Sequence, residues 1–219
     1  MRGVLLPIKN LAQAKQRLAP VLPAPDRARL MAAMMADMFA AVRAARHAAR
    51  VFVVTSAPQA MAAARDAGWE VLEESEQTSE SASVDWASSL CAARGITALL
   101  RLPCDLPLVR GADIDALLTG TLDEPTALMV PSRDGTGTNA LLRSPPTLFP
   151  SRFGPDSLVK HIAEAERAGA RVDIRRNPRL EMDVDDLDDL LELLTRDLTG
   201  TFTGDCLAAL GVQARIAAI

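Results

Sequence analysis

Short apolar runs alternate with longer amphipathic segments along most of the chain. Seven runs rich in β-type residues predict buried strands, at Val4–Ile8, Val51–Val54, Trp69–Leu72, Ala98–Leu102, Ala127–Val130, Asn139–Leu142 and Val172–Ile174. Apolar residues at helical spacing predict helices over Asp26–Arg46, Pro58–Ala67, Ser83–Arg94 and Ser157–Ala168. Strands that are apolar on both faces and alternate with helices are typical of covered sheets. We therefore predict an α/β fold, with a mainly parallel mixed sheet in a three-layer α/β/α arrangement.

The chain length and the unbroken pattern favour one large domain over two. The sequence has 219 residues, with no linker, internal repeat or low-complexity run. The exception to the regular pattern is residues 199–219, a tail of uncertain structure. Two interpretations of this tail stay open: a helix that packs on the body, and an apolar contact, through Leu207–Leu210 and Ile216–Ile219, in a homodimer.

The charge balance weakens any role in nucleic-acid binding. There are 24 basic and 28 acidic residues, a net charge of −4, and no tyrosine. Nucleic-acid partners need a basic face or aromatic stacking surfaces. The three cysteines are scattered, and no run approaches the about 20 apolar residues of a membrane span. We therefore expect a cytoplasmic protein without a nucleic-acid or membrane partner, in which a local cluster of cations can still bind a small anion.

Ligands of open α/β sheets bind beyond the carboxyl ends of the strands, so the segments that follow the strands carry the candidate chemistry. The segment after the first strand brings three cations, Lys9, Lys15 and Arg17. Cations in that place could neutralise a polyphosphate, and the guanidinium of Arg17 could bind two oxygens at once. A solvated surface segment is the alternative.

Two later segments contain carboxylates that could bind a metal ion. Asp105 stands between Pro103 and Pro107 after the fourth strand, where it suits a Mg²⁺ ligand; the alternative is a helix cap, for which Asp113 is the better candidate. Asp183 and Asp185 are two residues apart, so they share one face of an extended segment and favour a hard cation. The next three aspartates fit the first turn of a helix, which favours negative charge; they are Asp186, Asp188 and Asp189.

Two further segments suit an anion. The run Gly135-Thr136-Gly137-Thr138-Asn139 is neither a P-loop nor a dinucleotide fingerprint, but it offers close backbone approach and hydroxyl donors. The run Phe153-Gly154-Pro155-Asp156-Ser157 opens a helix whose N-terminus could bind an anion, although plain capping explains it equally well. The two histidines, His47 and His161, are interpreted as surface or packing residues.

These blocks, in this order, resemble the 2-phospholactate/phosphoenolpyruvate guanylyltransferases. The similarity runs over about residues 4–193, and its most specific parts are the Gly-Thr-Gly-Thr-Asn and Phe-Gly-Pro-x-Ser blocks. The resemblance implies a nucleotide-diphospho-sugar transferase (glycosyltransferase A) type of nucleotidyltransferase fold. It also implies transfer of GMP from GTP to a small phosphorylated carboxylic acid, with release of pyrophosphate, in coenzyme F(420) biosynthesis. The acceptor could be phosphoenolpyruvate, 2-phospholactate or 3-phosphoglycerate.

The resemblance also assigns expected roles to individual residues. The catalytic group is Lys15, Arg17 and Asp105, and the nucleotide-binding group is Pro7, Lys9, Lys15, Arg17, Ser83 and Asp85. The acceptor-binding group is Thr138, Asn139, Gly154 and Ser157. Asp105, Asp183 and Asp185 would hold Mg²⁺, as two ions. Such a site would act by alignment and charge neutralisation around an in-line displacement.

One segment departs from the family pattern. The chain has Ser83-Val84-Asp85 where the family has Gly-Leu-Asn near the nucleotide, which leaves the choice of base open. Two alternatives therefore stand beside the guanylyltransferase interpretation. One is a cytidylyl- or guanylyltransferase that acts on a molybdenum cofactor or a sugar phosphate, and the other is a non-catalytic nucleotide-binding module of the same fold.

Overall fold

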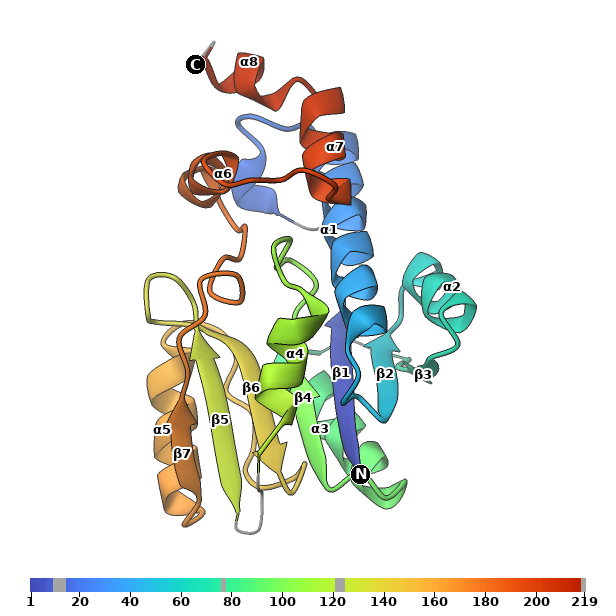
Figure 1. Ribbon diagram of the computed structural model, residues 1–219, viewed down its shortest axis with the longest axis vertical. Coiled ribbons are helices and arrows are strands. Elements are labelled where there is room, and N and C mark those ends of the chain that lie inside the picture. The colour runs from blue at the N-terminus through green and yellow to red at the C-terminus, as the bar shows by residue number, and fades with distance from the viewer. Residues whose placement is uncertain (10–14, 76–77, 121–124, 218–219) are drawn as a thin grey trace.

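A computed structural model describes residues 1–9, 15–75, 78–120 and 125–217 (Figure 1). Its centre is a seven-stranded sheet in the order β3-β2-β1-β4-β6-β5-β7. The strands are β1 (Arg2–Ile8), β2 (Arg50–Thr55), β3 (Glu70–Glu73), β4 (Ala98–Arg101), β5 (Thr126–Pro131), β6 (Thr138–Ser144) and β7 (Arg171–Ile174). All seven predicted strands are confirmed, with ends that move by one or two residues.

The sheet is parallel except for one strand. β6 pairs antiparallel with both of its neighbours, β4 and β5, whereas every other neighbouring pair is parallel. Because β6 runs in the opposite sense, its first residues meet the carboxyl ends of the other strands. The predicted mixed, mainly parallel sheet is confirmed, and this reversal brings Thr138 and Asn139 to the ligand-binding edge.

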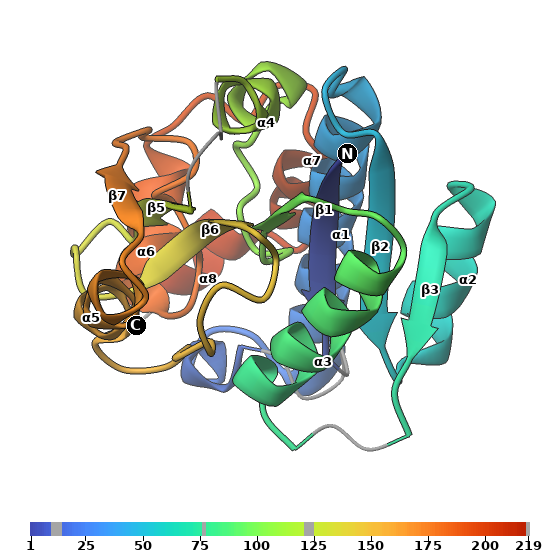
Figure 2. The same cartoon turned by 90° about the horizontal axis from the view of Figure 1, so that it is seen from below.

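Helices cover both faces of the sheet (Figure 2). They are α1 (Ala24–Ala44), α2 (Pro58–Asp66), α3 (Glu80–Ala93), α4 (Gly111–Leu118), α5 (Ser157–Arg167), α6 (Leu187–Leu194), α7 (Phe202–Ala209) and α8 (Val212–Ala217). α3 and α5 lie on one face and α1 and α4 on the other (Figure 2). The larger core lies on the α1 face, and separate clusters lie under α3 and α5. The described residues contain no helix long and apolar enough to cross a bilayer.

Helix α3 begins three residues earlier than the sequence predicted. Its N-cap is Ser79, whose hydroxyl accepts a hydrogen bond from the backbone N–H of Ala82. Ser83, which was expected to open the helix, therefore lies inside it. The first turn contains Glu80 and Ser81 and lacks the apolar residues that continue from Val84, so the sequence pattern does not mark it as helical.

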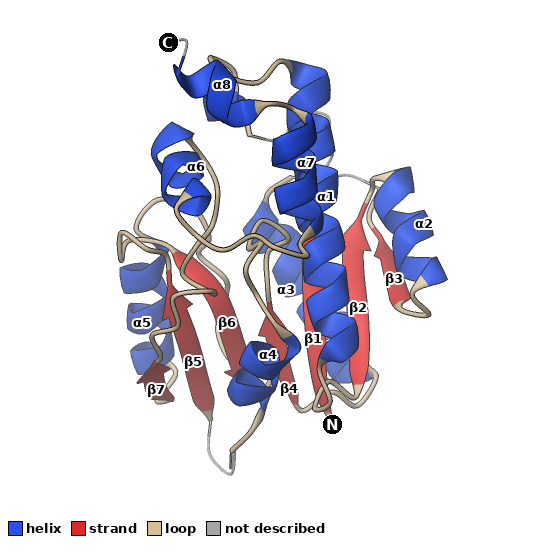
Figure 3. Cartoon of the chain, turned by 45° about the horizontal axis from the view of Figure 1, so that its top comes forward, coloured by secondary structure: helices blue, strands red, loops and turns tan. Residues whose placement is uncertain are grey.

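The C-terminal tail is helical and packs on the body of the same chain. α7 packs beside the upper part of α1, and α8 follows it beyond the same end of the sheet (Figures 1 and 3). Asp37 of α1 accepts hydrogen bonds from the backbone N–H groups of Phe202 and Thr203, both at 2.8 Å. Leu207 and Leu210 are buried within the chain, so these side chains are not free for the homodimer contact that was one interpretation of the tail. Residues 218–219 of that expected contact lie outside the described residues.

Candidate active site

A cavity of about 1110 Å³ lies where the carboxyl ends of β1 and β4 meet the start of β6. Its walls come from segments far apart in the sequence, including the loops after β1, β4 and β5 and the segment before α6 (Figure 3). Of the site residues expected from the sequence, all but Asp85 line it: Pro7, Lys9, Lys15, Arg17, Ser83, Asp105, Thr138, Asn139, Gly154, Ser157, Asp183 and Asp185. The parallel sheet explains this meeting, since strand ends of one sense share one edge.

Lys15 is the cation most firmly held in the cavity. Its Nζ lies 2.5 Å from Oδ2 of Asp105 and 2.7 Å from Oδ1 of Asp185, and only 6% of its side chain is exposed. The backbone of Lys15 has φ of +55°, an unusual conformation for a residue with a side chain. Burial alone would lower the pKa of Lys15, but the charges of Asp105 and Asp185 outweigh burial and raise the pKa above its usual range. Lys15 therefore stays charged at neutral pH.

The other two predicted cations are more open to solvent. Lys9 follows β1, and its Nζ lies 3.9 Å from Oε2 of Glu80, with 59% of its side chain exposed. Arg17 lies in the short turn η2 (Gln16–Leu18) and is exposed at the cavity wall. Residues 10–14, between these cations, lie outside the described residues. Three positive side chains, Lys9, Lys15 and Arg17, thus border one cavity.

The carboxylates of Asp105 and Asp183 are only partly hydrogen-bonded and neutralised by their neighbours in the cavity. Oδ1 of Asp105 is buried and has no hydrogen-bond partner among the described residues, while its Oδ2 contacts Lys15. Burial would raise the pKa of Asp105, but the Lys15 charge holds the pKa below its ordinary value. Burial raises the pKa of Asp183 to about 6, and the nearby charge of Asp105 adds to this rise. Asn139 donates one hydrogen bond to Asp183, at 3.1 Å.

These carboxylates suit a hard cation without forming a complete metal site by themselves. An orphaned carboxylate oxygen and a carboxyl group with a raised pKa both gain from a divalent cation, and oxygen donors are what Mg²⁺ prefers. Among the described residues, however, no three His, Cys, Asp or Glu side chains converge as a cluster that could hold a metal. Mg²⁺ therefore stays a prediction, with substrate oxygens or water needed to complete its ligands.

The cavity is also lined by hydroxyl groups and a helix N-terminus. Thr138 begins β6 and Ser157 begins α5, and their hydroxyl oxygens lie 3.3 Å apart. Gly154 has φ of +116°, which residues with a side chain rarely adopt, so the turn into α5 requires glycine. Asp156, for which plain capping was the alternative, makes no capping hydrogen bond with its side chain. Its carboxylate therefore does not cover the N-terminus of α5, although the N–H of Leu158 donates to the backbone oxygen of Thr136.

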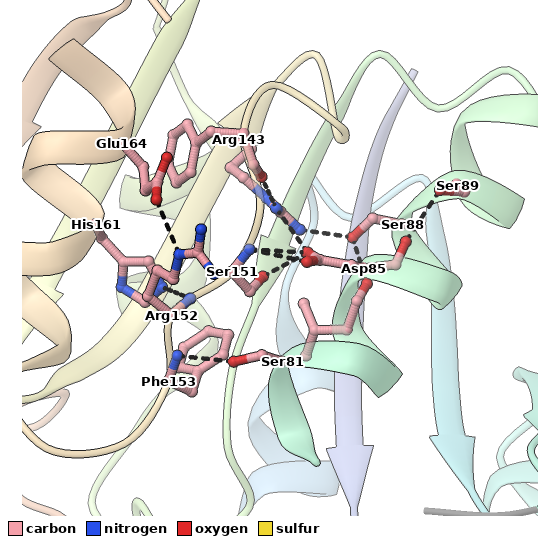
Figure 4. Close-up of polar contacts among 12 residues, drawn as sticks. Ser81, Asp85, Ser88, Ser89, Arg143, Ser151, Arg152, Phe153, His161 and Glu164 are labelled. Carbon is pink, nitrogen blue, oxygen red and sulfur yellow. Dashed lines mark hydrogen bonds and ion pairs between the residues drawn. The ribbon is translucent and has the colours of Figure 1, made fainter. Parts of the chain in front are cut away.

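The structure separates Ser83 from Asp85, which were expected to share a nucleotide-binding role. Ser83 lines the cavity, although its hydroxyl donates to Oε2 of Glu74 at 2.6 Å. Asp85 does not line the cavity; it faces the loop before α5, as Figure 4 shows. Its carboxylate accepts hydrogen bonds from the guanidinium of Arg143 and from the backbone and hydroxyl of Ser151. The geometry thus makes Asp85 a support for that loop.

The structure shows which of the aspartates considered as helix caps act as caps. Asp113 belongs to the first turn of α4, where it accepts from the backbone of Arg110 and pairs with Arg179. Asp186 and Asp189 form a capping box at the start of α6, as expected from the acidic first turn. Asp105 caps no helix among the described elements and contacts Lys15, so the cavity, and not helix capping, explains its position.

Sequence reasoning missed an ion pair in the cavity wall. Arg101, at the end of β4, pairs with Glu80 of α3, and its guanidinium lies 4.1 Å from the ring centroid of Phe153. Burial lowers the pKa of Arg101 to about 10, which leaves it charged at neutral pH. A charged residue that ends an otherwise apolar strand was the available signal. Its partner could not be found by pattern, because 21 residues separate the two.

Comparison with known proteins shows the family to which the chain belongs. A family model described as "Guanylyl transferase CofC like" matches residues 2–217. A phosphoenolpyruvate guanylyltransferase from Rubrobacter xylanophilus is 37% identical over 189 residues, covering 86% of this chain and 91% of that protein. A 2-phospho-L-lactate guanylyltransferase from Methanothermobacter thermautotrophicus is 30% identical over 190 residues, covering 87% of this chain and 82% of that protein.

Solved structures share the fold at low sequence identity. A protein from Desulfovibrio desulfuricans, provisionally described as a nucleotide-diphospho-sugar transferase, matches with a TM-score of 0.76 at 17% identity, covering 98% of this chain and 97% of that one. A nucleotidyl transferase from Methanothermobacter matches with a TM-score of 0.62 at 16% identity, covering 88% and 95%. The expected nucleotide-diphospho-sugar transferase type of fold is thereby confirmed. From the family match and these relatives, we conclude that the chain belongs to the guanylyltransferase family described as CofC-like and is a nucleotidyltransferase.

Proposed function

We propose that this enzyme transfers GMP from GTP to the phosphate of a small phosphorylated carboxylic acid and releases pyrophosphate. The observation that carries the proposal is that two chemically different groups of residues line a single cavity. One group is the cations Lys9, Lys15 and Arg17, and the other is Thr138, Gly154 and Ser157. Cations suit a triphosphate, whereas hydroxyl and backbone donors suit a smaller anion.

The proposed reaction is an in-line displacement at the α-phosphorus of GTP. An oxygen of the acceptor phosphate forms the new P–O bond, and the bond from the α-phosphorus to the bridging oxygen of the β-phosphate breaks. The electron pair of that bond leaves with pyrophosphate. The acceptor phosphate is already ionised at neutral pH, so the step needs no general base, and the protein contributes alignment and charge neutralisation.

Lys15 is the residue best placed to neutralise charge in this step. The ammonium group of Lys15 is buried, and the raised pKa of Lys15 keeps this group protonated. Two phosphate groups that must approach each other repel strongly in a cavity of lowered dielectric, and a fixed positive charge reduces this repulsion without reorganisation. Arg17, which is exposed at the same wall, supplies a second cation with a planar, bidentate donor set.

Mg²⁺ would be held by Asp105 and Asp183, with Asp185 as the third carboxylate. The buried oxygen of Asp105 without a partner and the raised pKa of Asp183 support this assignment. When bound, the cation would neutralise phosphate charge and orient the phosphate oxygens. The expected result for Asp183→Asn is loss of Mg²⁺-dependent pyrophosphate release from a chain that still folds; near-normal turnover would contradict the metal assignment.

The acceptor is proposed to be phosphoenolpyruvate or a close analogue such as 2-phospholactate or 3-phosphoglycerate. The names of the relatives support this class, since one is a phosphoenolpyruvate enzyme and another a 2-phospho-L-lactate enzyme. We also propose that the product enters coenzyme F(420) biosynthesis. The hydroxyl donor of Thr138 fits the oxygens of a carboxylate or phosphate, which only accept hydrogen bonds, while Ser157 donates to Thr138.

A matrix of nucleotides and acceptors tests the proposal. GTP, CTP, ATP and UTP are each combined with the three phosphocarboxylates, a sugar phosphate and molybdopterin, and pyrophosphate release is measured. We expect release with GTP and at least one phosphocarboxylate, at a rate at least tenfold above every other combination. Release only with the sugar phosphate or molybdopterin would move the enzyme to another acceptor class. Tight GTP binding without any product would favour a non-catalytic module.

A further inference from the structure

His161 is buried behind Thr138, which lines the cavity. It lies on α5, one turn after Ser157, so the two side chains share a helix face. The imidazole is 0% exposed. The ring of Phe153 meets it edge-on at a centroid distance of 4.8 Å, and the ring of Phe149 lies at 6.3 Å. The histidine is therefore enclosed by apolar rings and touches no solvent.

Both ring nitrogens of His161 have defined partners. Nε2 lies 2.8 Å from the backbone nitrogen of Arg152, and Nδ1 lies 3.0 Å from the hydroxyl oxygen of Thr138. The contact with Arg152 is seen in Figure 4, where the histidine faces the loop before α5. A backbone N–H can only donate, so Nε2 accepts and carries no proton. The histidine thus joins the loop before α5 to the first residue of β6.

The protonation state of the ring then follows. Burial lowers the pKa of His161 to about 3, and the positive charges of Arg101 and Arg143 contribute to this fall, against smaller opposing effects from Asp85 and Glu164. The ring is neutral at physiological pH and has one proton. Because Nε2 is an acceptor, that proton is on Nδ1, and Nδ1–H donates to the oxygen of Thr138.

The hydrogen bonds that the hydroxyl oxygen of Thr138 accepts determine where its own O–H can donate. Its oxygen accepts from Nδ1–H of His161, and Ser157 donates to the same oxygen from 3.3 Å. A hydroxyl has two acceptor positions and one donor, so both acceptor positions are filled. Its own O–H must therefore find another acceptor, and Thr138 lines the cavity.

We propose that His161 is a positioning residue that fixes the hydroxyl of Thr138 as a hydrogen-bond donor to the anionic acceptor substrate. The proposal rests on the proposed function, because it takes the acceptor to bind beside Thr138. A carboxylate or phosphate oxygen offers lone pairs only, so a hydroxyl held as a donor matches it, while a freely rotating one must first be ordered. A hydrogen bond to a charged group corresponds to an affinity change of about tenfold to a hundredfold.

Two substitutions of His161 test the contacts of its two ring nitrogens separately. In His161→Gln, the longer amide can place its oxygen where Nε2 accepts from Arg152, and no donor replaces Nδ1–H beside Thr138. In His161→Asn, the shorter amide can place its NH₂ group where Nδ1 donates to Thr138. The first variant keeps the contact with the loop, and the second keeps the contact that the proposal requires. His47→Gln, which removes the exposed histidine, is the matched control.

Steady-state kinetics with GTP and phosphoenolpyruvate give the first readout. We expect His161→Gln to raise KM for phosphoenolpyruvate by about tenfold to a hundredfold, with KM for GTP unchanged, and His161→Asn to recover most of that loss. A general structural defect would instead affect both substrates and both variants alike, and that result would overturn the proposal. Equal KM values for wild type and His161→Gln would overturn it as well.

The position of the ring proton gives a second readout that does not depend on turnover. The chain contains two histidines, so ¹⁵N-labelled histidine gives two imidazoles, which His47→Gln assigns. Long-range ¹H–¹⁵N spectra should show the proton of His161 on Nδ1 throughout pH 6 to 8. A proton on Nε2, or on both nitrogens, would overturn the proposal even in an active enzyme. Absence of guanylyl transfer by the wild type, with the proton found on Nδ1, would contradict the proposed function and leave only the geometry at Thr138 intact.

Discussion

The ammonium nitrogen of Lys15 lies 2.5 Å from a carboxylate oxygen of Asp105, although 90 residues separate the two in the chain. The strands that precede them, β1 and β4, are neighbours in the sheet. The same nitrogen lies 2.7 Å from Asp185, so one cation joins three loops at the sheet edge. The charges of the cavity are therefore organised by contacts between distant segments.

Replacing this cation should remove most of the activity. Lys15→Met takes away the buried positive charge that we propose neutralises the phosphates, and we expect kcat to fall by about 10²–10³-fold, the usual effect of losing one fixed charge stabiliser. Pyrophosphate release at saturating substrates measures the effect. Arg65→Met is the control, because Arg65 lies on α2 with 62% of its side chain exposed. Activity of Lys15→Met within threefold of wild type would contradict the role of Lys15.

Asp85 should matter for stability more than for chemistry. In Asp85→Asn, Arg143, whose side chain is 4% exposed, loses its counter-ion. We expect the free energy of unfolding to fall by about 2 kcal/mol, less than for a fully buried pair because Asp85 is 35% exposed. Urea unfolding measures this change, with the exposed Asp66→Asn as control. An equal effect in the two variants would show that Asp85 does not support the loop.

The C-terminal helices should loosen when their tertiary cap is removed. Asp37→Ala deletes the carboxylate that accepts from the first two N–H groups of α7. The expected loss is about 1–2 kcal/mol, with faster hydrogen exchange confined to α7 and α8. Asp205→Ala removes an exposed charge from the first turn of the same helix and serves as the control. Unchanged exchange in Asp37→Ala would mean that other contacts dock the tail.

Acid should destabilise the protein partly through His161. Its pKa is lowered to about 3 in the fold, from about 6.5, so its contribution to stability is present above pH 6.5 and is lost as the pH falls toward 3. The charged groups around it are Arg101, Arg143, Asp85 and Glu164. At about 1.36 kcal/mol per pKa unit, the stability difference between wild type and His161→Gln should shrink by roughly 3 kcal/mol between pH 7 and pH 4.

Unfolding curves at a series of pH values test this linkage. His47→Gln shows how much of any trend comes from losing an imidazole in general. A stability difference between wild type and His161→Gln that stays constant from pH 7 to pH 4 would mean that His161 titrates alike in the folded and unfolded chain. That result would also remove the support that its lowered pKa gives to a neutral ring.

The sequence predicted the sheet and most of the cavity wall because both follow from local pattern. Buried strands are continuous apolar runs, and the rule that ligands bind at strand ends then selects segments such as those containing Lys15 and Asp105. What local pattern does not contain is the partner of each charge. Asp85 matched a nucleotide-binding segment by position, yet its carboxylate contacts Ser151, 66 residues away.

The same limit explains why the contacts of His161 and of the C-terminal tail could not be predicted from the sequence. His161 looks like a packing residue in a helix, and only the fold brings it to Thr138, 23 residues earlier, and against the backbone of Arg152. The tail could not be placed for a similar reason, since the group that caps α7 is Asp37, at a separation of 165 residues. The spacing of apolar residues predicts the helices, the strands and the edge of the sheet at which a site lies. Contacts between residues far apart in the sequence are seen only in the structure.

The most direct test of the central claim is identification of the product by ³¹P NMR. The purified chain is incubated with GTP, phosphoenolpyruvate and Mg²⁺, with Lys15→Met in parallel. We predict that the GTP signals are replaced by pyrophosphate and, in equal amount, by a new phosphoanhydride that joins GMP to phosphoenolpyruvate. Unchanged GTP, or GDP and phosphate without that product, under conditions in which the chain is folded would contradict guanylyl transfer to a phosphocarboxylate.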